Sequence, residues 1–251
     1  MKIKKMKYKY CALGCLYIKD NPIHFQLAIE SILNQTINIP ICLIIDGPLS
    51  HDQEDLLSKY KKNINHLIRL KINVGLGLAL NHGLEILKSK YQYAIRFDSD
   101  DINLPVRFEQ LITNIELHEP DLIGSYMYEC SGKDLNIVNQ IRFVPVKENK
   151  IKSLSIYRNP FNHPTVAFRI QSVINVGCYD KLKYMQDWLL WIQLINKGYK
   201  VMNIEKCLVK FRFDEAMLKR RRGILYVKCE YFFFKKISLL TKEKKSNYLL
   251  S

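Results

Sequence analysis

Short apolar runs alternate with segments of helical periodicity along the first half of the chain. The runs at 11–18, 41–45, 68–72 and 93–97 have the length and composition of buried strands. Apolar residues at helical spacing follow each of the first three runs, as in Leu76–Leu87. Strands and helices that alternate at this spacing predict an α/β fold, with a mostly parallel, Rossmann-like sheet flanked by helices and wound right-handed.

The pattern changes in the second half. A helix is predicted around 108–115 and a strand around 122–128, whereas 132–164 is polar and proline-containing and predicts loops and short strands over the active-site face. A strongly apolar helix begins at Asp187, and Gly198 has the place of its C-cap. No internal repeat interrupts this order, so we expect a single domain.

Positive charge gathers at the two ends of the chain. The sequence has 39 Lys and Arg against 24 Asp and Glu, for a net charge of +15. Much of the excess follows residue 213, where Lys219–Arg222 precedes an apolar, aromatic stretch that includes Phe232–Phe234. We therefore divide the chain into a catalytic domain over 1–213 and a basic, aromatic helical extension over 214–251.

The extension has two interpretations, which the sequence leaves open. A basic amphipathic helix can lie on an anionic membrane surface, or it can pack its aromatic residues on the domain with Lys and Arg in solvent. No helix-turn-helix, zinc-finger or RNP-type signature is present, so no nucleic-acid partner is expected. No segment approaches the ~20 apolar residues of a membrane-spanning helix. The seven cysteines form no Cys-x-x-Cys pair, which favours a reducing, cytoplasmic location.

Three carboxylates follow the apolar run 93–97. Asp98, Asp100 and Asp101 stand at the carboxyl end of that predicted strand, where open α/β sheets bind their ligands. Acids this close together repel one another unless a cation lies among them, and such oxygen ligands suit Mg²⁺ or Mn²⁺. Alternatively, one of the acids caps the next helix, since Pro105 stands near a helix start.

Four further candidates have a structural alternative each. The glycine-rich turn Asn73–Gly83 can cradle a phosphate or form only a tight turn. Asp46 can accept a hydrogen bond from a base or ribose, or serve as a turn residue. Asp187 can act as a general base or as a helix cap. His163 can be a metal ligand, an acceptor contact or a structural histidine.

Taken together, these motifs resemble the family 2 glycosyltransferases, which are inverting nucleotide-sugar enzymes with the GT-A fold. The match is ordered and extends from about residue 12 to residue 213. Its motifs are Tyr17, Ala28–Thr36, Asp46-Gly47, Asn73–Gly83, Arg96–Ile102 with Pro105 and Arg107, Asn159–Pro164 and Gln186–Trp191. The family usually has Glu-Asp where this chain has Gln186-Asp187, so the charge beside the base is missing.

The resemblance implies a role for each matching residue. Tyr17 and Asp46 would contact the nucleotide base, and Asp187 would be the catalytic base. Further donor-binding residues would be Asn73, Asn81, Arg96 and Asp98. The Asp-x-Asp pair Asp98 and Asp100 would meet the diphosphate through Mn²⁺ or Mg²⁺.

The implied activity is hexosyl transfer from a nucleotide sugar to a lipid-diphosphate-linked saccharide. The reaction would take place at the inner face of the cell membrane, in the synthesis of a surface polysaccharide such as O-antigen or capsule. Galactose from UDP-galactose is the favoured donor, with N-acetylglucosamine, glucose and rhamnose open. A sugar nucleotidyltransferase shares the nucleotide fold, but its glycine-rich loop would follow the first strand, and Tyr17–Pro22 has no glycine. A nucleic-acid or polysaccharide binding protein on a degenerate transferase scaffold is the alternative from another class.

Overall fold

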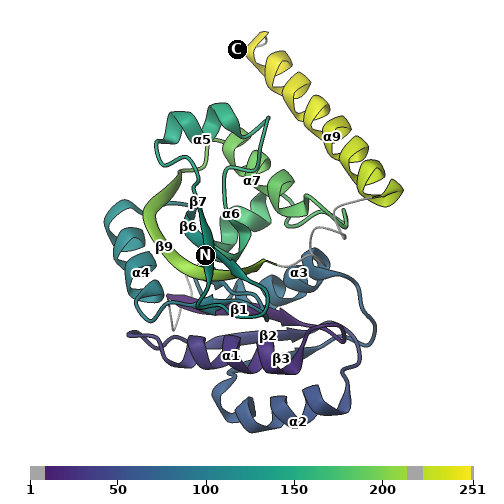
Figure 1. Ribbon diagram of the computed structural model, residues 1–251. Helices are drawn as coiled ribbons and strands as arrows, with labels where there is room; N and C mark the ends of the chain where they lie inside the picture. The colour runs from purple at the N-terminus through teal and green to yellow at the C-terminus, as the bar shows by residue number, and fades with distance from the viewer. Residues whose placement is uncertain (1–8, 214–222, 250–251) are drawn as a thin grey trace.

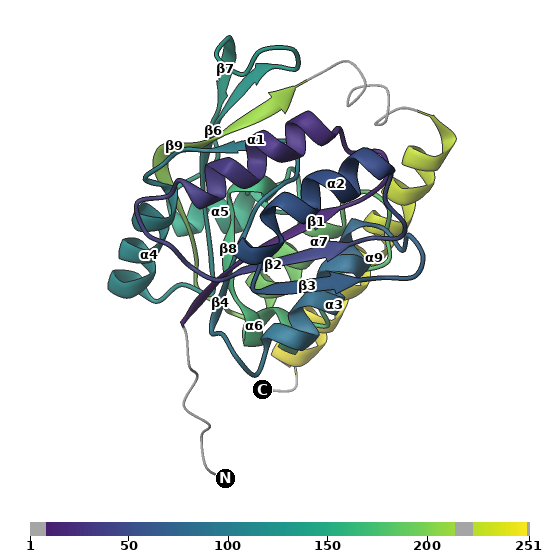
Figure 2. The same cartoon turned by 90° about the horizontal axis from the view of Figure 1, so that it is seen from below.

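One twisted sheet runs through the molecule (Figures 1 and 2). The computed structural model describes residues 9–213 and 223–249, with side chains up to residue 240. The strand order is β3-β2-β1-β4-β8-β6-β9-β5, and β7 pairs with β6. The predicted basic cluster 219–222 lies outside the described residues.

The first half of the chain forms four parallel strands. They are β1 (Tyr10–Leu16), β2 (Ile41–Ile45), β3 (His66–Arg69) and β4 (Tyr93–Arg96). The helices between them are α1 (Pro22–Leu33), α2 (His51–Tyr60) and α3 (Leu76–Leu87), with the 3-10 turn η1 (Lys61–Asn63) after α2. Because β1 pairs in parallel with both β2 and β4, the strand order reverses at β1, and a ligand crevice is expected at the carboxyl ends of β1 and β4.

The second half of the chain completes the sheet with antiparallel pairs and one long parallel pair, β6 with β9. Its strands are β5 (Ile102–Asn103), β6 (Leu122–Ser131), β7 (Val138–Arg142), β8 (Ala167–Arg169) and β9 (Val201–Phe213). Its helices are α4 (Arg107–His118), α5 (Glu148–Leu154), η2 (His163–Thr165), α6 (Ile170–Asn175), α7 (Gln186–Asn196) and α9 (Ile224–Leu249).

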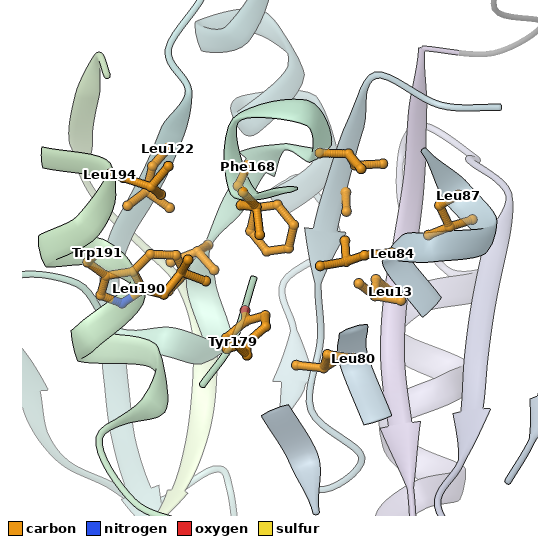
Figure 3. Packing of buried hydrophobic residues seen from close by; sticks show 14 of the residues in the cluster. Leu13, Leu80, Leu84, Leu87, Leu122, Phe168, Tyr179, Leu190, Trp191 and Leu194 are labelled. Atoms are coloured by element: carbon orange, nitrogen blue, oxygen red, sulfur yellow. The ribbon is translucent and has the colours of Figure 1, made fainter. Parts of the chain in front are cut away.

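Two apolar cores lie on opposite faces of the sheet, because alternate residues of a strand point to opposite sides. Leu13 of β1 belongs to the core under α3, α6 and α7, and Ala12 belongs to the core under α1, α2 and α4. Figure 3 shows the first core, where Trp191 and Tyr179 face the same cluster as Leu80. The result is the predicted three-layer α/β arrangement.

Glycine is required at position 14 by the packing of the central strands. A Cβ atom added to Gly14 would lie only 2.3 Å from the ring of Phe97. The ring of Phe97, directly before the carboxylate loop, therefore packs on the backbone of β1. This contact joins the two strand ends that border the crevice.

The sequence predicted the regular elements of the first half well. The predicted strand at 41–45 is β2, and Gly198 follows α7 with a φ of +82°. Ser50-x-x-Gln53 has the sequence pattern of a capping box, and it forms one at the start of α2. Several elements differ from the prediction. β3 begins two residues before the predicted 68–72, the helix α5 lies within the segment predicted to hold loops and short strands, and the 13-residue strand β9 was not predicted.

The extension ends in the long helix α9, which packs on α7 (Figure 1). Phe233 and Ile237 of α9 are buried against Leu189 and Ile192 of α7. The Trp188 and Phe233 ring centroids lie 4.5 Å apart. Across the described part of the chain, no helix combines the length and the apolar character needed to cross a membrane.

Candidate active site

The loop after β1 is clamped to its surroundings by Gln53. This fully buried side chain donates Nε2 to the carbonyl oxygens of Tyr17 at 2.9 Å and of Asp20 at 2.8 Å. The Asp20 carboxylate in turn accepts from the Tyr17 N–H at 3.1 Å and from the Ser99 hydroxyl at 2.7 Å. Tyr17 is therefore held beside the loop that follows β4, as expected of residues at the two carboxyl ends.

The loop after β4 is built on two buried arginines. Arg96 donates to both carboxylate oxygens of Asp98, with Nη1 to Oδ2 at 2.7 Å. Arg107 donates Nη2 to the carbonyl oxygens of Arg96 at 2.6 Å and of Pro164 at 3.0 Å. Burial, reinforced by the neighbouring charge of Arg96, lowers the pKa of Arg107 to about 9. Arg96 thus lies between the acidic loop and the buried scaffold, and Asp98 is its ion-pair partner.

Negative charge accumulates around this loop. Burial and the charges of Asp100 and Asp98 raise the pKa of Asp101 well above its ordinary value. Burial, together with the same two charges, raises the pKa of Asp20 to about 7 although Ser99 and Tyr17 donate to it. In both carboxyls burial is the main cause of the raised pKa, and the charges of Asp98 and Asp100 add to it; a bound cation would relieve that added repulsion.

The residues fit a divalent cation only in part. No three His, Cys, Asp or Glu side chains within the described residues are placed to share an ion. The predicted set of Asp98, Asp100 and His163 is therefore not assembled as three ligands. Both oxygens of Asp98 accept from Arg96. Mg²⁺ commonly uses one or two carboxylates and takes its other ligands from water and phosphate, so Asp98 and Asp100 would suffice as protein ligands only if Asp98 shared its oxygens between Arg96 and the ion.

His163 has a structural environment in the fold. Its Nε2 lies 3.0 Å from the Tyr179 hydroxyl, and its ring lies edge-on to Trp191 at 5.9 Å between centroids. Burial and the charge of Arg96 lower its pKa well below the ordinary value, so the imidazole is neutral at pH 7. Within the described residues no two carboxylates or thiols group with His163 to share an ion, so the structure gives no support to His163 as a third metal ligand.

Asp46 and Asn73 bind each other. The carboxylate of Asp46 accepts from Asn73 Nδ2 at 2.9 Å, from the Val74 N–H at 2.7 Å and from the Gly75 N–H at 2.9 Å. Asp46 is only 2% exposed. The backbone N–H groups at the start of the glycine-rich turn are therefore used within the protein, and they do not form the open phosphate cradle considered from the sequence.

Asn81 also has an internal partner. Its Nδ2 donates to the carbonyl oxygen of Tyr179 at 2.8 Å, and its Oδ1 accepts from the Tyr179 N–H at 3.0 Å. This reciprocal pair joins α3 to the segment before α7. Asn81 thus fixes the position of Tyr179, whose hydroxyl contacts His163.

Asp187 lies in the first turn of α7 with partial solvent access. Asn159 donates Nδ2 to Asp187 Oδ2 at 2.7 Å. Burial by the surrounding protein raises the pKa of Asp187, against the opposing effects of Asn159, nearby backbone N–H groups and the charge of Arg96. A reachable carboxylate with a raised pKa has the properties of a general base.

Gln186 occupies the place where the family usually has Glu. It is buried, and a Cβ atom added to Gly77 would lie 3.1 Å from its Cγ. Gly77 is in the first turn of α3, so the first turns of α3 and α7 meet here. The neutral amide adds no charge beside Asp187.

The structure brings together residues that the sequence suggested separately, and it adds two. The charge of Arg96 lowers the pKa of His163, and it opposes the effect of burial on the pKa of Asp187. His163 and Asp187 therefore both lie near the Arg96 guanidinium. Asp20 and Asn159 were missed as functional candidates. Asp20 reads as a turn residue before Asn-Pro, and Asn159 lies in a matching motif without an indicated role, so no local signal distinguishes them.

Comparisons with known proteins agree with this arrangement. Residues 25–181 match the sequence profile described as Glycosyl transferase family 2. The amylovoran biosynthesis glycosyltransferase AmsE of Erwinia amylovora is 35% identical over 226 residues, covering 88% of this chain and 82% of that protein. The UDP-Gal:alpha-D-GlcNAc-diphosphoundecaprenol beta-1,3-galactosyltransferase of Escherichia coli is 32% identical over 239 residues, covering 90% of this chain and 84% of that protein.

A solved structure has the same fold. The crystal structure of S. aureus TarS 1-349 in complex with UDP superimposes with a TM-score of 0.62 at 18% identity, covering 80% of this chain and 59% of that chain. At this identity the likeness concerns the fold alone. It confirms the predicted α/β architecture with a sheet flanked by helices.

Proposed function

The chain belongs to glycosyl transferase family 2, and on this premise we propose that it is an inverting hexosyltransferase acting on a lipid-diphosphate-linked saccharide. Membership makes it a glycosyltransferase, and its relatives act in polysaccharide biosynthesis. The observation that carries the finer proposal is Asp187, a partly exposed carboxylate with a raised pKa that feels the charge of Arg96, the ion-pair partner of Asp98. The alternative of a sugar nucleotidyltransferase is set aside, because enzymes of this family transfer sugars and not nucleotides.

Asp187 is proposed to take the proton of the acceptor hydroxyl. As that oxygen attacks the anomeric carbon, the bond from this carbon to the diphosphate oxygen breaks, and the nucleoside diphosphate leaves with the bonding electron pair. Attack from the face opposite the leaving group inverts the anomeric centre. An α-linked donor then gives a β-linkage.

UDP-galactose is the proposed donor. Support comes from the galactosyltransferase activity for which the E. coli relative is named and from the UDP bound to TarS. Tyr17, at the carboxyl end of β1, is proposed to contact the base, with Asp46 and Asn73 shaping that side of the pocket. Asn81 is proposed to act through Tyr179, and Arg96 to contribute positive charge near the diphosphate.

Asp98 and Asp100 are proposed to hold Mn²⁺ or Mg²⁺ together with the diphosphate. The cation would stabilise the negative charge that develops on the phosphate oxygens as the leaving group departs. The charges of Asp98 and Asp100 add to the effect of burial on the pKa values of Asp20 and Asp101, so a cation held by this pair would relieve repulsion in the loop. We give His163 no ligand role.

The outer face of α9 is proposed to bind an anionic membrane surface, where a lipid-linked acceptor is found. Large apolar side chains on this face are exposed, including Ile224, Val227, Tyr231 and Phe232. Exposed apolar residues beside lysines suit a surface of anionic lipid headgroups and acyl chains. Since nucleotide sugars are made in the cytoplasm and all seven cysteines are free, we place the enzyme at the inner face of the membrane.

The test is release of nucleoside diphosphate from UDP-galactose, UDP-N-acetylglucosamine, UDP-glucose and a rhamnose donor. Each is supplied with Mn²⁺ or Mg²⁺ and an N-acetylglucosaminyl diphospholipid acceptor. We expect turnover with UDP-galactose, and a loss of about 10²–10⁴-fold in kcat for Asp187→Asn. The exposed variant Asp55→Asn is the control and should behave as the wild type.

Two outcomes would contradict the proposal. Full activity of Asp187→Asn would exclude this residue as the base. Absence of turnover with every donor, together with binding of polysaccharide or oligonucleotide, would instead indicate a binding protein on a transferase scaffold.

A further inference from the structure

We infer that Asn159 is a positioning residue for the catalytic base, an inference that rests on the proposed function of Asp187. Both ends of its amide are used. Nδ2 donates to Asp187 Oδ2 at 2.7 Å, and Oδ1 accepts from the Phe161 N–H at 3.2 Å. The backbone N–H of Phe161 can donate only to the amide oxygen of Asn159. The NH₂ group of Asn159 is therefore the end that faces the Asp187 carboxylate.

The loop that carries Asn159 is fastened to the sheet. Asn162 donates Nδ2 to the carbonyl oxygen of Ser125 in β6 at 3.0 Å. Asn203 of β9 donates Nδ2 to the carbonyl oxygen of Pro160 at 3.0 Å. The residues on both sides of Phe161 therefore have fixed positions relative to the central strands, and Asn159 is held from a rigid support.

The same loop packs on the helix that carries the base. The ring of Phe161 is edge-on to Trp191 with the centroids 5.9 Å apart. Trp191 lies four residues after Asp187, hence about one turn along the same face of α7. Trp191 is also fully buried in the core shown in Figure 3. The ring contact between Phe161 and Trp191 and the hydrogen bond between Asn159 and Asp187 together fix the distance between the Asn159 amide and the first turn of α7.

This arrangement balances two opposing effects on the base. Burial raises the pKa of Asp187, which makes it a stronger proton acceptor, and the bond from Asn159 favours the ionised form. Asp187 must be ionised to take the proton from the hydroxyl group of the acceptor. Asn159 therefore keeps the base ready at neutral pH and restricts its rotation, without itself touching a reacting atom.

The test compares kcat/KM against pH for the wild type, Asn159→Ala and Asn159→Asp. Loss of the donor moves the acid limb of Asn159→Ala to higher pH, and we expect kcat/KM at pH 6 to fall about 10- to 100-fold. The added negative charge in Asn159→Asp should move the acid limb upward as well. The KM for the nucleotide sugar should stay unchanged, because the amide of Asn159 bonds to Asp187 and Phe161, neither of which is proposed to bind the donor.

Asn65→Ala is the matched control. It removes a side-chain amide that accepts from the Ile41 N–H at 2.8 Å, at the start of β2 and apart from the loop of Asn159, so it should lower the melting temperature and leave the acid limb in place. If Asn159→Ala behaved in the same way, with lower stability and an unchanged acid limb, Asn159 would be structural only and the inference would be overturned.

A readout without turnover separates this inference from the proposed function. The Asp187 carboxyl carbon is followed by NMR in ¹³C-Asp-labelled protein and assigned with Asp187→Asn. Its titration should move to higher pH in Asn159→Ala even if no donor is consumed. An unchanged titration would reject the role of Asn159, whereas absence of turnover in the wild type would reject only the proposed activity.

Discussion

At the residue scale, the aspartates of this region differ in their bonding and in their pKa because their neighbours differ. Asp46 is saturated by one side chain and two backbone N–H groups, whereas Asp98 is paired with Arg96. Asp20 resists ionisation, and Asp187 is held by an amide donor. Burial raises the pKa of both, but the charge of Arg96 opposes this shift only at Asp187.

Asp20 makes stability depend on pH in a direction opposite to that of most carboxylates. Its pKa of about 7 in the folded protein exceeds the ordinary 3.8, so folding favours the protonated form. Its contribution is therefore most favourable below about pH 4 and becomes less favourable as the pH rises toward 7. Asp20→Asn should be more stable than the wild type at pH 8 by about 1–3 kcal/mol, with little difference near pH 4.

Urea unfolding at pH 4.5 and pH 8 checks this expectation, with Asp55→Asn as the exposed control. A variant that is equally destabilised at both pH values would show that Asp20 acts only through its hydrogen bonds to Tyr17 and Ser99.

At the element scale, helix ends and loops carry the site, and single side chains often join two of them. Gln53 completes the capping box of α2 by accepting from the Ser50 N–H at 3.0 Å, and it also holds the loop after β1. Asn81 joins α3 to the segment before α7 in the same manner. The elements around the expected crevice are thus joined by side-chain amides.

Substitution of Gln53 should therefore cost more than substitution of the helix cap itself. Ser50→Ala removes a capping hydroxyl and should cost about 1 kcal/mol. Gln53→Ala leaves the buried carbonyls of Tyr17 and Asp20 without this donor and should cost about 3 kcal/mol. Urea denaturation measures both variants, and calorimetry should show weaker nucleotide-sugar binding for Gln53→Ala alone. Equal losses for the two variants would contradict the second role of Gln53.

At the scale of the whole molecule, the described part of the extension is docked and also presents apolar surface. Phe233 is fully buried against α7, and Lys236 donates to Asp180 Oδ2 at 2.6 Å. The adjacent Phe232 is 50% exposed. The two interpretations of the sequence, packing on the domain and membrane contact, therefore concern different faces of α9. The docked face places α9 beside the helix that carries Asp187.

The neighbouring pair Phe233 and Phe232 separates these two faces. Phe233→Ala should lower the free energy of unfolding by about 3 kcal/mol, because it leaves a cavity against Trp188. Phe232→Ala should change it by less than about 0.5 kcal/mol. In co-sedimentation with vesicles of phosphatidylglycerol and phosphatidylcholine, Phe232→Ala should bind less than the wild type. Unchanged sedimentation of a Phe232→Ala, Tyr231→Ala double variant would argue against membrane contact.

The sequence by itself determined the elements whose signals are local. The apolar run of β2, the capping box of α2 and the glycine after α7 each depend on neighbours within a few residues, so periodicity and cap chemistry revealed them. The order of its motifs also indicated the family. By contrast, β9 owes its length to pairing with β6, and polar residues such as Glu205 and Lys206 interrupt its pattern.

Only the tertiary structure decided which candidates use their polar atoms within the protein. Asn73 meets Asp46 across 27 residues, and Asn81 meets Tyr179 across 98. The donor beside Asp187 comes from Asn159, 28 residues away. Residue type and spacing state what a side chain is able to bind, but chain folding selects its partners, because hydrogen bonds and pKa shifts depend on groups within a few ångströms whatever their distance in sequence.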